Sequence, residues 1–227
     1  MKLENVSANY DRLARTYDFW DRWVAEPLAG MSGLRERTVA ALHLAEGNRV
    51  LDIGCGTGLN LPLLVDAVGA AGDVVALDYS QGMLDRARQK ADRANWRNVT
   101  LVRGDAAKLE GVGEGFDAVM STWALGIVEE LPSALRQAVE VLKPGGRLAI
   151  LDLHRTRARS GLRRQVVDPM LHCVLRTAGV DSKEDLDEGR LWVRWKEGKA
   201  FLTDALHDVV IEENVRGSGF LLTGRKP

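Results

Sequence analysis

Three alternating glycines and two carboxylates are the residues of this chain whose spacing best suits the binding of a small molecule. An apolar run at residues 49–53 leads directly into Gly-Cys-Gly-Thr-Gly at residues 54–58. Glycine at such positions lets the backbone approach a ligand where a Cβ atom would collide. Asp52 precedes the turn, and Asp78 ends the next apolar run, where its carboxylate can accept both hydroxyls of a ribose. The pattern predicts a nucleoside-binding site.

The length of the glycine turn separates two kinds of nucleoside ligand. The dinucleotide fingerprint is G-x-G-x-x-G, and its second and third glycines serve a pyrophosphate. Residues 54–58 read G-x-G-x-G, one residue shorter, and Asp52 stands just before them. A carboxylate there would repel a pyrophosphate, so the turn favours a nucleoside without phosphate groups.

Regular alternation of apolar runs and helical patterns surrounds the turn. Such alternation predicts a parallel sheet with right-handed crossovers. Two final strands joined by a short link favour an antiparallel hairpin. The expected strands are 49–53, 74–78, 99–103, 116–121, 147–153, 207–215 and 219–225, and the expected helices are 7–45 in part, 58–68, 81–94, 132–142 and a short one after Thr122.

These elements predict an α/β, Rossmann-like fold. Its sheet would have seven mostly parallel strands with an antiparallel C-terminal strand, helices on both faces and an N-terminal helical lid. A single domain spans residues 1–227. Within it we expect a lid at 1–45, a ligand-binding core at 46–154, a substrate- or membrane-facing insertion at 155–203 and a C-terminal hairpin at 204–227.

The composition limits which classes of function and which cellular compartment are expected. A net charge of -1 over 227 residues argues against a protein that grips nucleic acid through overall charge. Cys55 and Cys173 are both expected to be reduced, which suits the cytoplasm. No N-terminal signal core is visible, and no apolar run approaches the roughly 18–20 residues of a membrane span. The four histidines and two cysteines lack zinc-like spacing, so no metal is expected.

Residues 50–58 resemble motif I of the class I methyltransferases that use S-adenosylmethionine (SAM) and release S-adenosylhomocysteine (SAH). Three later stretches, 102–106, 116–121 and 142–148, resemble further motifs of that family, so the resemblance covers residues 45–155. It implies a SAM-dependent enzyme in which Asp105 lies beside the adenine amino group. The residues implied to hold SAM are Asp52, Gly54, Cys55, Gly56, Thr57, Gly58, Asp78, Tyr79, Met83, Gly104, Asp105, Ala106 and Ser121.

Residues 10–18, Tyr-Asp-Arg-Leu-Ala-Arg-Thr-Tyr-Asp, resemble the opening of two groups within the family. One group methylates quinone precursors, and the other methylates the amine of phosphatidylethanolamine. Residues 121–125 and 219–226 favour the lipid group, and residues 203–207 replace the turn usual in quinone methyltransferases. The leading expectation is therefore N-methylation of a phospholipid head group. C-methylation of a quinol and methylation of a small soluble metabolite are the alternatives.

Two other classes of function fit less well. Nucleic-acid methyltransferases that act on exocyclic base amines carry Asn/Asp-Pro-Pro-Tyr/Phe after strand four, where this chain reads Ser-Thr-Trp-Ala at residues 121–124. A SAM-binding protein without turnover is the remaining class. We therefore expect a small-molecule or lipid substrate and no nucleic acid, and the oligomeric state is not predicted.

Methyl transfer from a sulfonium requires alignment of the acceptor and exclusion of water. The resemblance implies that Tyr10 and Tyr17 close over the site, although their spacing also suits packing residues on an apolar helix face. His154 follows the fifth strand and could remove a proton from a phenol or help to neutralise an amine. A surface histidine at the start of a basic loop is the alternative. Trp123 is expected at the substrate.

The insertion begins with a dense group of arginines that has no acid before Asp168. Arginines beside an apolar stripe and tryptophans suit the surface of an anionic membrane or a phosphate head group. A solvated helix face is the alternative, in which case the membrane contact would be absent. The residues concerned are Arg155, Arg157, Arg159, Arg163, Arg164, Trp192 and Trp195.

Overall fold

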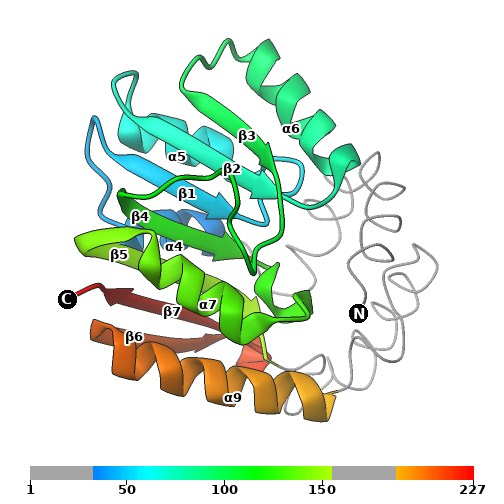
Figure 1. Ribbon diagram of the computed structural model, residues 1–227, viewed down its shortest axis with the longest axis vertical. Coiled ribbons are helices and arrows are strands. Elements are labelled where there is room, and N and C mark those ends of the chain that lie inside the picture. Colours follow the sequence, from blue (N-terminus) through cyan, green and yellow to red (C-terminus); the bar gives the residue numbers. More distant parts are fainter. Residues whose placement is uncertain (1–32, 155–187) are drawn as a thin grey trace.

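The computed structural model describes residues 33–154 and 188–227. Its centre is a seven-stranded sheet in the order β3-β2-β1-β4-β5-β7-β6 (Figure 1). Neighbouring strands run parallel from β3 to β5, and β7 is antiparallel to both β5 and β6. The Rossmann-like, mostly parallel sheet predicted from the sequence is confirmed. The strands are β1 Arg49–Ile53, β2 Asp73–Asp78, β3 Val99–Arg103, β4 Phe116–Thr122, β5 Leu142–Leu153, β6 His207–Asn214 and β7 Gly219–Arg225.

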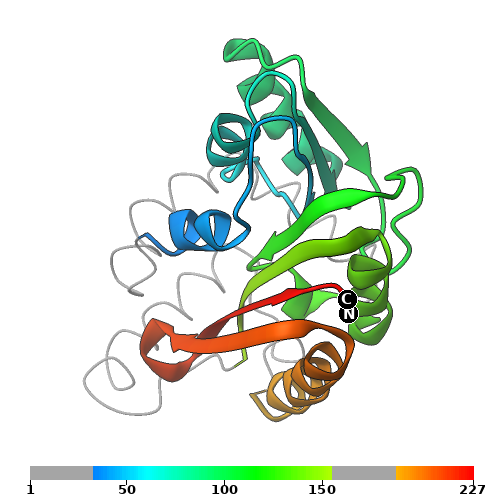
Figure 2. The ribbon, with the colours of Figure 1, turned by 90° about the vertical axis from the view of Figure 1, so that its left-hand side faces the viewer.

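Helices cover both faces of the sheet. Val50 and Leu51 are consecutive in β1, so their side chains point to opposite faces. Val50 belongs to the apolar cluster that contains residues of α4 Leu34–Ala41, α5 Leu61–Val68 and α6 Gln81–Arg93. Leu51 belongs to the cluster that contains residues of α7 Leu131–Glu140 and α9 Glu188–Ala205. Figure 2 shows α4 and α9 on opposite sides of the twisted sheet.

The central strands are buried on both faces because helical crossovers cover them. β1 and β2 are accordingly almost continuous apolar runs, and the backbone pairs of β1 extend from Arg49 opposite Asp73 to Ile53 opposite Leu77. This register brings the carboxyl ends of β1 and β2 to the same level of the sheet. It therefore places the glycine turn that follows β1 beside Asp78.

Several boundaries differ from those expected from the sequence. α5 begins at Leu61 rather than at residue 58, because Gly58 has a φ of 76° and belongs to the turn. β5 begins at Leu142, five residues earlier than expected. The short helix after Thr122 is a 3-10 helix, Leu125–Ile127. The expected C-terminal hairpin is present as β6 and β7, joined by the 3-10 turn Val215–Gly217.

The last third of the expected insertion, from residue 188, lies in α9, and this placement corrects one expectation. Trp195 was expected to reach a membrane surface, but its side chain is fully buried. It packs edge-on against Phe220 of β7 with 4.8 Å between the ring centroids. The helix turns Trp195 towards the sheet because it must bury an apolar stripe there. None of the helices in the described ranges is both long and apolar enough to span a bilayer.

The buried indole of Trp195 generates the first prediction. We expect Trp195→Ala to lower the free energy of unfolding by about 3–5 kcal/mol, because the substitution removes apolar contacts and leaves a cavity against the sheet. Lys196→Ala, at the adjacent exposed position of α9, is the matched control and should change it little. Urea denaturation measures both variants. A loss below about 1 kcal/mol for Trp195→Ala would contradict the core position.

Candidate active site

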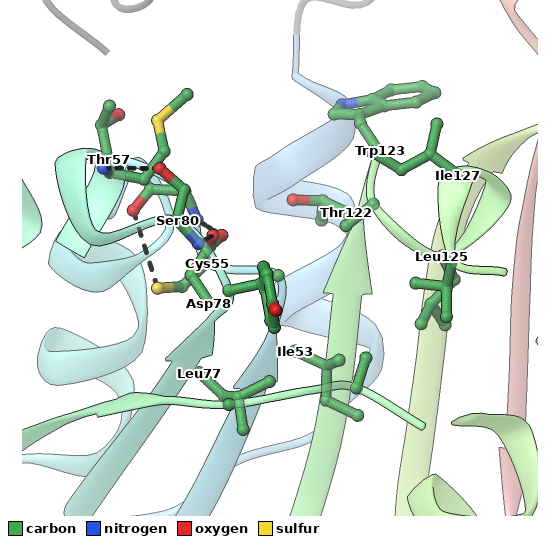
Figure 3. Close-up of a pocket in the computed structure, with 18 of the residues that line it drawn as sticks. Ile53, Cys55, Thr57, Leu77, Asp78, Ser80, Thr122, Trp123, Leu125 and Ile127 are labelled. Atoms are coloured by element: carbon green, nitrogen blue, oxygen red, sulfur yellow. Dashed lines mark hydrogen bonds between the residues drawn. The ribbon is translucent and has the colours of Figure 1, made fainter. Parts of the chain in front are cut away.

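A pocket opens at the carboxyl ends of the central strands (Figure 3). β1 and β4 are neighbours, but their chains leave in opposite directions, β1 towards β2 and β4 towards β5. Open α/β sheets bind ligands at such a switch point. The pocket holds about 910 Å³ of space, part of it open to solvent. Its walls are the glycine turn, the end of β2, the loop after β3 and the segment that follows β4.

The glycine turn is docked onto the end of β2. The backbone amides of Gly54 and Cys55 both donate to the carbonyl oxygen of Leu77, at 2.8 and 3.0 Å. A Cβ at position 54 would lie 2.3 Å from the Cβ of Ala124, so only glycine allows the turn to approach the segment after β4. A Cβ at position 56 would meet nothing within 4 Å. The turn needs glycine at position 56 because its φ is 56°, and Gly56 lines the pocket with backbone alone.

Asp78 is held in place by two backbone amides. Its Oδ2 accepts from the amide of Gly56 at 2.8 Å, and its Oδ1 accepts from the amide of Ser80 at 2.9 Å. Ser80 caps α6, because its hydroxyl accepts from the amide of Met83. The half-buried carboxylate lines the pocket beside the glycine turn (Figure 3). This position suits an acceptor for the hydroxyls of a ribose.

The thiol of Cys55 is expected to be unreactive. Its side chain is buried beneath the turn, and burial raises the pKa of the thiol well above its ordinary value, with the nearby charges of Asp78 and Asp52 acting in the same direction. Sγ is 3.7 Å from the carbonyl oxygen of Gly56, to which it donates. The cysteine is therefore a neutral packing residue rather than a nucleophile.

The pocket wall beyond Asp78 comes from the loop after β3. Asp105 lines the pocket, and its Oδ1 accepts from the amide of Ala107 at 2.9 Å, which fixes the carboxylate in the loop. Most of the residues that the sequence singles out for a nucleoside are thus brought together. Those that line the pocket are Gly54, Cys55, Gly56, Thr57, Asp78, Tyr79, Met83, Gly104, Asp105 and Ala106.

Asp52 does not join them. Its side chain is fully buried and accepts from Nδ2 of Asn60, which lies 3.1 and 3.3 Å from the two carboxylate oxygens. The same Nδ2 lies 3.0 Å from Oγ1 of Thr122, and Arg35 donates to Oδ1 of Asn60 and to Oγ1 of Thr122. Arg35 and Thr122 both line the pocket. Asp52 therefore supports the pocket from beneath through this polar network.

Two further sequence candidates also lie away from the described pocket lining. Gly58 allows close packing, because a Cβ there would lie 2.6 Å from Cδ1 of Leu61. Ser121 is buried in β4, and its hydroxyl has no hydrogen-bond partner in the part of the chain that the structure describes. Tyr10, Tyr17 and the arginines at 155, 157, 159, 163 and 164 lie outside the described residues.

His154 also does not line the described pocket, contrary to expectation. Its amide donates to the carbonyl oxygen of Ser218, and its Nε2 lies 3.2 Å from the carbonyl oxygen of Gly217. β5 stands between β4 and β7, and these contacts hold His154 on the β7 side, whereas the pocket lies on the β4 side. A residue at the end of a strand can pair with either neighbour, which sequence position alone does not reveal.

The ring of His154 is buried among side chains of α9 and β7. Phe220 stacks on the imidazole and Trp192 contacts it edge-on, with centroid distances of 5.5 and 5.1 Å. Nζ of Lys199 lies 2.8 Å from Nδ1, and burial lowers the pKa of this lysine to about 8. This arrangement fastens α9 to the sheet.

The buried carboxyl of Asp52 generates a prediction of pH dependence. Burial raises its pKa from 3.8 to about 6, although Asn60 and Arg35 act in the opposite direction. The folded state therefore binds a proton more tightly than the unfolded chain between these values, and ionisation of Asp52 weakens folding as the pH rises through this window. The full cost, present above about pH 6, is on the order of 3 kcal/mol.

We expect Asp52→Asn to remove this cost, because the amide cannot ionise and still offers Oδ1 to Asn60. The stability of the variant relative to the natural protein should improve by up to about 3 kcal/mol between pH 4 and pH 7. Urea denaturation across that range measures the difference. Asp66→Asn, at an exposed position of α5, is the control. A difference between Asp52→Asn and the natural protein that does not change with pH would contradict the assignment.

Comparison with known proteins agrees with this geometry. Residues 50–146 match the family model described as "Methyltransferase domain". The demethylmenaquinone methyltransferase of Listeria welshimeri is 32% identical over 152 residues, which are 66% of this chain and 60% of that protein. The 2-phytyl-1,4-naphtoquinone methyltransferase of Synechococcus elongatus is 38% identical over 157 residues, 66% and 64% of the two chains. The chain thus spans less than two thirds of the length of these curated relatives.

Solved structures share the fold. The N-methyltransferase NodS from Bradyrhizobium japonicum, in complex with SAH, superimposes with a TM-score of 0.63 at 20% identity and covers 98% of this chain and 99% of its own. A SAM-dependent methyltransferase from Aquifex aeolicus gives a TM-score of 0.60 at 22% identity, with coverage of 85% and 89%. Residues 50–146 are therefore a methyltransferase domain, carried on the fold of the class I SAM-dependent methyltransferases, and the resemblance seen in the sequence is confirmed.

Proposed function

We propose that this chain binds SAM in the pocket and transfers its methyl group to a ring carbon of a quinol-type acceptor. The observation that carries SAM binding is the Asp78 carboxylate, fixed by the Gly56 and Ser80 amides on the pocket wall. A carboxylate held in this way is pre-organised to accept hydroxyl groups. Gly56 lines the same pocket, and without a side chain it lets the protein backbone approach the ligand.

The charges around the pocket also suit SAM. Asp78 would accept the ribose hydroxyls, and Asp105 with Ala106 would face the adenine. Of the lining residues in the described part of the chain, Arg35 is the one cation, and it would pair with the carboxylate of the methionine portion. When bound, SAM would supply an activated methyl group: its carbon–sulfur bond would break as the new carbon–carbon bond forms, sulfur would keep the electron pair, and the ring carbon would lose its proton to solvent as the ring regains aromaticity.

The acceptor is assigned from the relatives and from the apolar wall of the pocket. Both curated relatives named above are quinone methyltransferases by name. The wall that follows β4 is formed by Leu125, Ile127 and Val128, which suit an apolar ring better than a charged head group. No base is needed to activate the methyl group, so the work of the protein is alignment of the acceptor and exclusion of water.

The phospholipid amine expected from the sequence has less support. Its physical argument rested on five arginines, which lie outside the described residues, and on tryptophans of α9. Trp195 is a core residue, and Trp192 is half-buried against His154. Lipid N-methylation therefore serves as the competing outcome when the acceptor is identified.

SAM binding is tested by Asp78→Ala. We expect the variant to bind SAH about 10- to 150-fold more weakly, because the ribose hydroxyls lose a charged acceptor worth about 1.5–3 kcal/mol. Isothermal titration calorimetry measures the affinity. Asp73→Ala, at the opposite end of the same strand, removes a carboxylate far from the pocket and is the matched control. Unchanged affinity for SAH in Asp78→Ala would remove the assignment.

The acceptor is tested by supplying methyl-labelled SAM with two substrates in parallel. One is a short-chain prenylated naphthoquinol kept reduced, and the other is vesicles that contain phosphatidylethanolamine. We expect the label on a ring carbon of the naphthoquinol, identified by mass spectrometry of the product. Label found only on the head-group nitrogen would instead establish the lipid reaction and contradict the proposal.

A further inference from the structure

The wall of the pocket that follows β4 is apolar and continuous in sequence. Trp123, Leu125 and Ile127 of this wall lie across the pocket from Asp78 (Figure 3). Because Asp78 and Asp105 suit the nucleoside, the wall after β4 is left for the molecule that receives the methyl group. The residues of this wall, called here the acceptor wall, are Trp123, Ala124, Leu125, Ile127 and Val128.

Trp123 is held in an unfavourable backbone conformation. Its φ is 57°, in the left-handed region that bulky residues rarely adopt and that costs on the order of 1 kcal/mol or more. The amide of Trp123 donates to the carbonyl oxygen of Leu151 at 2.8 Å, which fixes this conformation at the end of β4. One consequence is the position of the indole, which lies at the rim of the pocket above Thr122 and beside Ile127 (Figure 3).

The indole is supported from behind. Trp123 is half-buried and packs against the small apolar cluster of Leu34, Leu151, Val215 and Leu221 while it also lines the pocket. A side chain that is packed on one part of its surface and open to a cavity on another has little freedom to turn. The strained backbone at Trp123 therefore accompanies an indole that is held by packing and presents an aromatic surface to the pocket.

The rest of the acceptor wall is fastened from two other elements. Oδ2 of Asp152, in β5, accepts from the amide of Gly126 at 2.9 Å. The guanidinium of Arg194, in α9, donates to the carbonyl oxygens of Gly126, Val128 and Glu129. Both side chains are withdrawn from water, since Asp152 is buried and Arg194 is half-buried. These hydrogen bonds fasten the backbone of the acceptor wall to β5 and α9.

We propose that Trp123 determines acceptor specificity by stacking against the flat ring of the molecule that is methylated, with Ile127 and Val128 covering the edge of that ring. The proposal rests on the proposed function and assigns the subsite for its second substrate. A rigid indole gains both apolar burial and ring–ring attraction from an aromatic partner. An alkyl amine would gain much less from the same surface, so the wall selects for a ring.

The kinetic test compares Trp123→Leu and Trp123→Phe with Trp96→Leu, which removes a half-buried tryptophan that does not line the pocket. For a reduced naphthoquinol, we expect KM to rise about 10-fold or more in Trp123→Leu. The affinity for SAH and the value of kcat should change less than about 3-fold in the same variant. In Trp123→Phe the KM should return most of the way to the natural value, and in the control Trp96→Leu it should equal that value. A KM within 2-fold of the natural value in Trp123→Leu would overturn the proposal.

A second measurement needs no turnover. Oxidised 1,4-naphthoquinone, added to the SAH-bound protein, should quench part of the tryptophan fluorescence in a saturable way, because the quinone accepts an electron from the excited state of a stacked indole and then returns it. That saturable part should disappear in Trp123→Phe and persist in Trp96→Leu. Equal quenching in Trp123→Phe and the natural protein would overturn the proposal that Trp123 stacks against the acceptor ring, even if methyl transfer occurs. If the natural protein methylates no naphthoquinol, the proposed function fails, while quenching still decides whether Trp123 binds a flat ring.

Discussion

A hydrogen bond of 2.8 Å from the amide of Gly56 to the carboxylate of Asp78 ties the glycine turn to the end of β2 in the pocket. It can form because β1 and β2 pair in a register that ends with Ile53 opposite Leu77. The amides of Gly54 and Cys55 extend that pairing into the turn by donating to Leu77. The bond closes the turn, orients the carboxylate and leaves the start of α6 beside it.

Beneath the turn, a buried polar network trades stability for position. Asp52 is withdrawn from water among Asn60, Thr122 and Arg35, and burial raises its pKa to about 6. Apolar residues of similar size would often make such an interior more stable. The network instead links α4, α5 and β4 below the pocket and orients the guanidinium of Arg35 at its wall. Two carboxylates, Asp52 and Asp152, thus serve to hold backbone and side chains around the ligand-binding space.

The part of the site that the sequence predicts is the part encoded locally. The glycine turn and Asp78 each follow an apolar strand, and parallel pairing brings strand ends together without further information. Arg35 and Thr122 are 87 residues apart, and no spacing rule connects them before the fold is known. Asn60 does carry a signal in the sequence, because a polar residue two positions after the turn, at the start of a buried helix, needs hydrogen-bond partners.

The predictions for His154 and Trp195 are wrong for related geometric reasons. His154 does follow a central strand, but β5 has β4 on one side and β7 on the other, and the hairpin binds the histidine on the wrong side for the pocket. Trp195 lies on α9, and packing against Phe220 of β7 determines which face of that helix is buried. In both cases the residue type suggested chemistry, and the packing of a distant segment decided its role.

The account depends most on where the nucleoside lies. A crystal structure of the chain with SAH tests this directly, because it shows the ribose, the adenine and the sulfur at once. The account predicts both ribose hydroxyls within hydrogen-bond distance, about 2.5–3.2 Å, of the Asp78 carboxylate, with the adenine beside Asp105 and Ala106 and the sulfur turned towards the acceptor wall. SAH bound elsewhere, or with its ribose away from Asp78, would contradict the account.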